Sequence, residues 1–578
     1  MHQDNPFSDP SIPSFEQIRD QIASDYSILR QRRMDMVSAI NRLPDWLGLP
    51  LSMIPANTEF LRQKFKNFHH DQVGVTKRRV QNVRSLLMRA MRCLGLPTTL
   101  ASYQSHMSDE WQLLYDALPG RYAKTALSRF MRYCSKQKIL PGDMNDAIAA
   151  RFLDALVRES LIKNPKVTHQ TVCRVWNQMA DAVDRWPTIK LTVPCYDDGR
   201  IYAISDDLLP PHLIKETDAY LEFLKGDDLF SGLAKPFRPA SVTAVRGNIH
   251  RYLSALHHDG FDIASLRSLA DMVEFDVFKR AMKWFWKRNE EKTSKHIGEI
   301  AWTLRCIAVK HLKCDEETAK LYRDAIEKLR VPQNGLSEKN TAVLRQFDDP
   351  RLVVRFLNYP DNLFDAAKKL NGQKAHLLAQ AATATLILTF APMRIKNLAE
   401  LRIDQNLNWV SDRLHIHVPA GQVKNNETLH FIFPAGASER VRNYIDRDRS
   451  LFLPNANPFL FPGRNGHHKD ISALRNQITR TLFDHTGIRL TPHQFRHVAA
   501  KLLLDARPGH YEVVRKLLGH KNLTTTYAHY AGAETQAAIA LYDQVILDRK
   551  RGAPGRVAPD DNGPFLDPFN PFLKEFRQ

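Results

Sequence analysis

A helix start near the C-terminal end of the sequence combines a histidine and an arginine on one face. In TPHQFRH, Thr491 suits a helix N-cap, Pro492 falls at the first helical position, and Gln494 completes a capping-box pattern. His493 and Arg496 are three residues apart in the first turn and therefore share a face. A helix N-terminus exposes unpaired N–H groups, and a guanidinium fork matches phosphate oxygens. Taken alone, however, these residues fit an ordinary capped helix with an exposed arginine better than a phosphate site.

A second group of reactive side chains follows about twenty residues later, in VRKLLGHKNLTTTYAHYAG. It holds Leu-Gly-His at 518–520 and Tyr530, which comes ten residues after His520. Together with His493 and Arg496, this order resembles the signature of the phage integrase family of tyrosine recombinases. That signature is His-x-x-Arg at a helix start, then Leu-Gly-His, then a tyrosine nine or ten residues later.

The resemblance extends upstream to two further basic residues. Arg394 follows an apolar helical stretch in APMRIKNLAEL, where the family carries its first arginine. Lys424 lies in the loop of a hairpin predicted from the alternating pattern of LHIHVPAGQVKNNETLHFIFP, where the family carries its lysine. All six family positions are therefore filled in order: Arg394, Lys424, His493, Arg496, His520 and Tyr530.

Two positions depart from the family pattern. An acidic residue usually stands three residues after the first arginine, where this sequence has Asn397, and Glu400 is the alternative support for that arginine. The tyrosine usually stands nine residues after the histidine of Leu-Gly-His, where this sequence has His529. We prefer Tyr530 as the nucleophile because the continuation YAGAETQAAIALYDQVILD is similar to a branch with a spacing of ten. Tyr527 remains the alternative.

The resemblance implies how these residue types would cut and rejoin DNA. A covalent phosphotyrosine stores the phosphodiester energy and splits one transfer into two similar steps. A phenol has a pKa of about 10 and needs a base; by resemblance, His493 is the base toward Tyr530 and Lys424 is the acid that protonates the leaving 5′-oxygen. The two arginines clamp the non-bridging oxygens, and His520 adds a hydrogen bond. No metal or other cofactor is implied, because this clamp supplies the positive charge.

The composition favours a polyanionic partner. Lysine and arginine number 82 against 63 acidic residues, a formal net charge of +19, which fits double-stranded DNA with specific recombination sites. The longest apolar stretch, residues 381–390, is much shorter than the ~20 residues of a membrane helix. We therefore expect a cytoplasmic, nucleoid-associated protein with no membrane partner. The six cysteines are scattered without a CxxC pair and are expected to be free thiols.

Helical patterns dominate the sequence and give way to a mixed pattern near its end, which predicts a mainly α fold with a small β-sheet in an α+β catalytic domain. We expect five regions: a flexible N-terminal arm at 1–14, an extra helical domain for DNA binding or oligomerisation at 15–190, a helical core-binding domain that clamps DNA at 211–330, a catalytic tyrosine recombinase domain at 341–549, and a flexible C-terminal tail at 550–578.

The resemblance also implies a homo-tetramer on two DNA sites, with accessory DNA-binding proteins or sister recombinases as further partners. The segment after Tyr530 is where the family exchanges a helix or tail between subunits. Four aromatic residues of the tail suit such docking: Phe565, Phe569, Phe572 and Phe576.

Two other functions fit part of the pattern. A type IB topoisomerase uses a similar set of basic residues and a tyrosine, but relaxes supercoils as a monomer; the integrase-like continuation after Tyr530 argues against it. A catalytically inactive DNA-binding protein is the other alternative, although a decayed site would be expected to lack one of the six residues. The preferred function is integration, excision or resolution of a mobile element, and the target sequence cannot be read from the chain.

Overall fold

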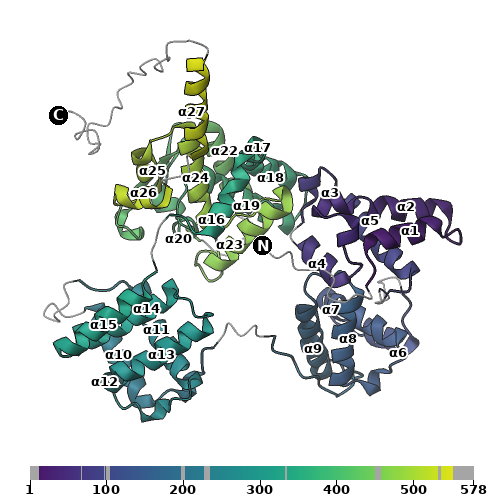
Figure 1. Ribbon diagram of the computed structural model, residues 1–578, viewed down its shortest axis with the longest axis horizontal. Coiled ribbons are helices and arrows are strands. Elements are labelled where there is room, and N and C mark those ends of the chain that lie inside the picture. Colours follow the sequence, from purple (N-terminus) through teal and green to yellow (C-terminus); the bar gives the residue numbers. More distant parts are fainter. Residues whose placement is uncertain are drawn as a thin grey trace. The chain divides into compact units, whose positions relative to one another are not determined.

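The computed structural model of the chain describes residues 12–550, apart from 67, 97, 99–104, 197–201, 227–234, 332–334, 450–456 and 531–534. The described chain is mainly helical with a small antiparallel sheet, which confirms the predicted fold class (Figure 1). The predicted C-terminal tail, including its four phenylalanines, lies outside the described residues from 551 onward, and so do residues 1–11 of the predicted N-terminal arm.

The chain divides into two compact units. The first comprises Met1–Asp116, Ser128–Pro165 and Asn334–Gln578, and the second comprises Ala117–Leu127 and Lys166–Gln333. The helices up to residue 182 are α1 (Phe15–Ser24), α2 (Arg30–Ile40), α3 (Leu43–Leu47), α4 (Thr58–Lys66), α5 (Lys77–Cys93), α6 (Asp109–Asp116), α7 (Gly120–Lys136), α8 (Asp146–Glu159) and α9 (Pro165–Ala182). Those of the following block are α10 (Pro211–Lys225), α11 (Pro239–His258), α12 (Leu269–Met272), α13 (Phe275–Arg288), α14 (Lys295–Arg305) and α15 (Glu316–Leu329).

The C-terminal region of the first unit holds all six predicted site residues. Its helices are α16 (Glu338–Leu344), α17 (Pro350–Leu357), α18 (Tyr359–Lys368), α19 (Gln373–Phe390), α20 (Ile395–Ala399), α21 (Ile403–Asn406), α22 (Ala435–Asn443), α23 (Ile471–Thr486), α24 (Pro492–Ala506), α25 (Tyr511–Leu518), α26 (Leu523–Tyr530) and α27 (Thr535–Lys550). Its strands are β1 (Leu407–Val410), β2 (Arg413–Val418) and β3 (Leu429–Ile432).

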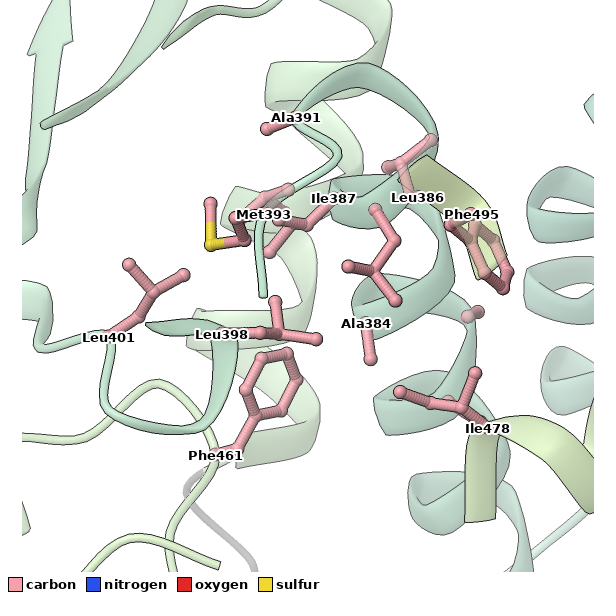
Figure 2. Packing of buried hydrophobic residues seen from close by; sticks show 14 of the residues in the cluster. Ala384, Leu386, Ile387, Ala391, Met393, Leu398, Leu401, Phe461, Ile478 and Phe495 are labelled. Atoms are coloured by element: carbon pink, nitrogen blue, oxygen red, sulfur yellow. The ribbon is translucent and has the colours of Figure 1, made fainter. Parts of the chain in front are cut away.

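Helix α19 is the centre of this region because it is apolar on nearly all sides. Its small Ala and Thr side chains let neighbouring helices approach closely, and its buried threonines donate to carbonyls one turn earlier, as Thr385 Oγ1 does to the Ala381 carbonyl at 2.7 Å. Figure 2 shows Ala384 and Ile387 of α19 among core side chains from other elements, including Leu398 of α20, Ile478 of α23 and Phe495 of α24. This core fixes the elements from which the site residues project.

The predicted hairpin is confirmed. Strands β2 and β3 pair antiparallel, with Val418 opposite Leu429, and β1 adds to the other edge of β2. The alternating sequence places Leu414, Ile416 and Val418 on the buried face. The ten residues between the paired ends, 419–428, form the loop that carries Lys424.

None of the described helices combines the length and the apolar content that crossing a lipid bilayer requires. All six cysteines are free thiols, as predicted.

Candidate active site

Helix α24 begins as the sequence predicts. Thr491 is its N-cap, with the backbone N–H donating to Gln494 Oε1 at 2.8 Å, and Pro492 occupies the first helical position. Arg496 lies in the first turn. An ordinary capped helix would expose this arginine, but only 3% of its area is exposed. The start of α24 therefore points an arginine inward.

Arg496 links two loops of the site. Its Nη1 donates to the carbonyl oxygen of Pro392 at 2.6 Å, and its Nη2 donates to that of Leu518 at 2.7 Å. Pro392 lies just before Arg394, and Leu518 lies just before Gly519 and His520. Burial, and secondarily the charge of Arg394, lower the pKa of Arg496 to about 10, so it is still a cation at neutral pH.

Arg394 emerges where α19 ends. The helix stops at Phe390 because Pro392 biases the residue before it away from helical geometry, and Ala391 has φ −129° and ψ 81°, outside the helical region. Met393 is fully buried and anchors the turn, after which Arg394 forms the N-cap of α20. Burial lowers the pKa of this half-buried arginine. The charge of Arg394 contributes to the lowered pKa of Arg496, which requires that the two cations lie near each other.

The loop that carries Lys424 is tied to the rest of the site by the next residue, Asn425. Asn425 Oδ1 accepts from Arg394 Nη2 at 3.3 Å, and its Nδ2 donates to the Gly519 carbonyl at 3.1 Å. The Lys424 side chain itself is exposed. Asn425 therefore connects three of the predicted elements: the first arginine, the lysine loop and the Leu-Gly-His turn.

Asn397, which departs from the family pattern, bonds to the loop that carries Lys424. It is buried, and its Nδ2 donates to the Gln422 carbonyl of the Lys424 loop at 2.9 Å. An ionised carboxylate could not make this bond because it only accepts. Glu400 lies 3.6 Å from Lys396 Nζ in an ion pair along α20. Asn397 thus supports the lysine loop, and Glu400 is engaged with a neighbouring lysine.

The Leu-Gly-His turn requires its glycine. Gly519 ends α25 in the left-handed conformation at φ +59°, and a Cβ there would lie 2.5 Å from Leu429 Cδ2. Arg515 holds the turn by donating from Nη1 to the His520 carbonyl at 2.9 Å. His520 is buried, and its Nδ1 lies 3.0 Å from Thr526 Oγ1. Burial and the charge of Arg496 lower the pKa of His520 to about 4, so this ring is neutral at pH 7.

Tyr530 ends α26 inside this cluster. It is 2% exposed, and its ring lies parallel to that of His520 with centroids 6.5 Å apart. Its Oη lies 2.8 Å from Nδ1 of His497. Burial raises the pKa of Tyr530, while the nearby Arg496 cation lowers it in part. Tyr527 instead packs against Tyr511, with ring centroids 4.3 Å apart.

His493 and His497 occupy different surroundings although they are one turn apart on α24. The His493 side chain is exposed to solvent on one side. Partial burial on its other side and the charges of Arg496 and Arg394 lower its pKa. His497 is 8% exposed and was not among the predicted site residues. The signal that could have found it is its spacing of four from His493, which puts both rings on one side of the helix; their centroids are 5.2 Å apart.

The structure therefore gathers five of the six predicted residues around one electropositive cluster and ties the Lys424 loop to it through Asn425. Two guanidinium groups beside neutral imidazoles can together coordinate an anion such as a phosphodiester, with a phenol beside it. Within the described chain, the side chains grouped closely enough to hold a metal ion are His69, His70 and Asp71, none of which is a predicted site residue.

For the DNA cleavage that the resemblance implies, changing Asn425 to aspartate is expected to lower the rate by about 10- to 100-fold, more than changing it to alanine. A carboxylate there would pair with Arg394 and repel the phosphate, at a cost of roughly 1–4 kcal/mol over a few ångströms, whereas alanine only removes two hydrogen bonds. Rates of covalent adduct formation measure the difference. Asn426→Asp makes the same charge change one residue away, at an exposed left-handed position that aspartate tolerates, and serves as the control. Equal losses for both aspartate variants would contradict the bridging role of Asn425.

Residues 360–537 match the family model described as the phage integrase family. Among curated proteins, tyrosine recombinase XerC of Corynebacterium glutamicum is 34% identical over 110 residues, which is 18% of this chain. The match spans about a third (34%) of the length of that recombinase.

Solved structures with similarity to the chain include three recombinases. The XerA recombinase structure is 16% identical, with a TM-score of 0.25, and the match covers 57% of this chain and 98% of that one. The Tn1549 transposon integrase in complex with circular intermediate DNA is 15% identical, with a TM-score of 0.35, covering 56% and 98%. A lambda integrase dimer bound to a COC′ core site is 11% identical, with a TM-score of 0.35, covering 56% and 95%.

Proposed function

Because residues 360–537 match the model of the phage integrase family, we propose that this chain is a site-specific tyrosine recombinase. It cuts and rejoins double-stranded DNA through a covalent 3′-phosphotyrosine on Tyr530. The observation that carries the proposal is the position of the Tyr530 phenol, 2.8 Å from the imidazole of His497 and within the electrostatic reach of Arg496 of the same chain. A neighbouring proton acceptor activates a phenol for attack on a phosphate, and a nearby cation stabilises the phenolate that forms.

Each of the other residues has a role in the proposed reaction. Arg394 and Arg496 bind the non-bridging oxygens, where charge accumulates in the transition state. A guanidinium carries five N–H groups, and the two carbonyls bonded to Arg496 take one each. His520 supplies a hydrogen bond to the phosphate. Lys424, on an exposed loop, protonates the leaving 5′-oxygen.

The remaining regions have roles by analogy. The block at 211–330 clamps DNA together with the catalytic region at 341–549, chiefly through phosphate contacts. The block at 15–190 is a further DNA-binding or oligomerisation module. Strand exchange takes place in a tetramer on two DNA sites, in the cytoplasm at the nucleoid, and serves the integration, excision or resolution of a mobile element.

The proposal is tested by trapping the protein on DNA. Purified chain is incubated with fragmented genomic DNA of the organism that encodes it, the mixture is denatured with detergent, and DNA that stays attached to protein is sequenced. We expect one enriched sequence and, with two duplexes that contain it, recombinant products.

A type IB topoisomerase is the alternative function, and two further measurements distinguish it from a recombinase. Relaxation of a supercoiled plasmid that lacks the enriched sequence, with no recombinant product from duplexes that contain it, would favour the topoisomerase. Absence of any protein-linked DNA would contradict both enzymes and favour a catalytically inactive DNA-binding protein.

A further inference from the structure

We propose that His497 accepts the proton of Tyr530 when the phenol attacks DNA, a role that family resemblance gives to His493. The inference rests on the proposed function and adds to it a residue that the sequence signature does not contain. His497 touches the reacting oxygen itself, so it is a catalytic residue in the proposed reaction.

The geometry favours His497 over His493. His497 Nδ1 lies 2.8 Å from Tyr530 Oη, inside the range for direct proton transfer. Both side chains are more than nine-tenths buried, at 8% and 2% exposure, so solvent does not compete for this hydrogen bond. His493 lies one helical turn earlier, with its ring nearly perpendicular to that of His497 and its side chain exposed.

The two histidines at the start of α24 therefore have different roles in the proposed reaction. His493 is exposed and so accessible to a DNA phosphate, whereas His497 and Tyr530 are buried. His493 is a phosphate contact in this scheme. His497 is reserved for the phenol.

Bound DNA would strengthen His497 as a base. In the DNA-free chain, burial lowers the pKa of His497 to about 4, and so do His493, Arg496, His529 and His520 around it. An incoming phosphate diester brings negative charge to these same groups. A nearby anion favours the protonated imidazole and so raises its pKa again. The proton transfer is therefore less unfavourable when DNA occupies the site than in the DNA-free chain.

The step balances as follows. The bond from Tyr530 Oη to phosphorus forms while the bond from phosphorus to the 5′-oxygen breaks. The phenol proton moves to His497 Nδ1, which requires the ring to carry its own proton on Nε2 beforehand. The leaving 5′-oxygen takes a proton from the acid, proposed to be Lys424. Rejoining is the reverse reaction, in which His497 returns the proton to the phenol.

The test uses His497→Asn in the full chain, with duplexes that carry the enriched sequence. The asparagine amide can occupy the position of Nδ1 and hydrogen-bond the phenol, but it cannot take a proton. We expect unchanged DNA affinity and an adduct rate lower by ~10²–10⁴. The rate of the variant should rise about ten-fold per pH unit, as the fraction of ionised tyrosine does below its pKa. The wild-type rate should depend less steeply on pH.

His510→Asn is the matched control. His510 is exposed at the N-cap of α25, is not one of the groups that shift the pKa of His497, and should tolerate the change with less than a few-fold loss of rate. Hydrogen peroxide distinguishes a catalytic role of His497 from a structural one. In a Tyr530→Phe background, peroxide replaces the tyrosine as the nucleophile, so cleavage by peroxide reports whether the rest of the site is intact. Adding His497→Asn to that background should leave peroxide cleavage unchanged, because His497 serves only the phenol.

The outcomes distinguish this inference from the proposed function. Three outcomes would overturn the role of His497 and leave the proposed function standing. They are a normal adduct rate in His497→Asn, an adduct rate of that variant that does not change with pH, and the loss of peroxide cleavage in the double variant. A His493→Asn variant with the steep pH profile instead would return that role to His493. A wild-type chain that forms no adduct would contradict the proposed function itself.

Discussion

Replacing Arg496 with lysine is expected to lower the rate of covalent adduct formation by about 10²–10³, the usual effect of removing one donor that stabilises transition-state charge. Lysine keeps the positive charge but loses the planar fork. It cannot bond the carbonyls of Pro392 and Leu518 while also holding a phosphate oxygen in a fixed direction. DNA affinity should fall by much less, because most binding energy comes from phosphate contacts elsewhere along the duplex.

Lysine is a sharper test than alanine. Alanine would leave two buried carbonyl groups without their donor, at about 1–3 kcal/mol each, and a loss of activity could then reflect unfolding. Thermal unfolding of Arg496→Lys, followed beside its adduct rate, controls for this. Arg507→Lys makes the same exchange at the exposed C-terminal end of α24 and should change neither quantity. Full activity of Arg496→Lys would show that Arg496 is only a structural link between two loops.

Replacing Tyr530 with phenylalanine is expected to abolish covalent adducts with DNA altogether, while Tyr527→Phe should keep them at nearly the wild-type level. Phenylalanine at 530 preserves the ring that packs beside His520 and removes only the nucleophilic oxygen. Phenylalanine at 527 likewise preserves the contact with Tyr511. Denaturing gels of protein mixed with labelled duplex measure both variants.

The two tyrosine variants are matched in chemistry, since each loses one hydroxyl group. Loss of the hydrogen bond to His497 should change stability by only about 0.5–1.5 kcal/mol, so both proteins are expected to remain folded. Adducts in Tyr530→Phe together with their absence in Tyr527→Phe would assign the nucleophile to Tyr527.

Local patterns could be read from the sequence because local physics determines them. The capping box at Thr491 and Gln494 depends on residues three apart, and the β2–β3 hairpin depends on alternation of apolar and polar side chains. Both are confirmed by the hydrogen bonds of the structure. Five of the six predicted site residues lie in one cluster, and the apolar core that α19 and α24 share holds the two elements that lead to Arg394 and Arg496.

The missed features depend on contacts between segments that are far apart in the sequence. His497 and Tyr530 are 33 residues apart in the sequence. They become partners only because the fold brings the end of α26 to α24. Asn425 gains its role from Arg394, 31 residues before it, and Gly519, 94 residues after it. An asparagine in a polar loop gives no such signal, since loops commonly contain asparagine for their turn geometry alone.

The choice between the two tyrosines also lies beyond local pattern. Tyr527 and Tyr530 are three apart on α26, so both fall on the same side of the helix. Their partners separate them: Tyr511 for one, His497 and His520 for the other. The sequence that continues from Tyr530 suggested this residue as the nucleophile, and its burial in the cationic cluster supports the same proposal.

Mass spectrometry of the peptide that remains attached to DNA tests the central claim most directly. Wild-type protein is trapped on a duplex with the enriched sequence, digested with protease and nuclease, and the modified peptide is fragmented. We predict a nucleotide joined through its 3′-phosphate to the phenolic oxygen of Tyr530. A nucleotide on Tyr527, on a residue outside α26, or on no residue of a protein that cuts the duplex would contradict the account.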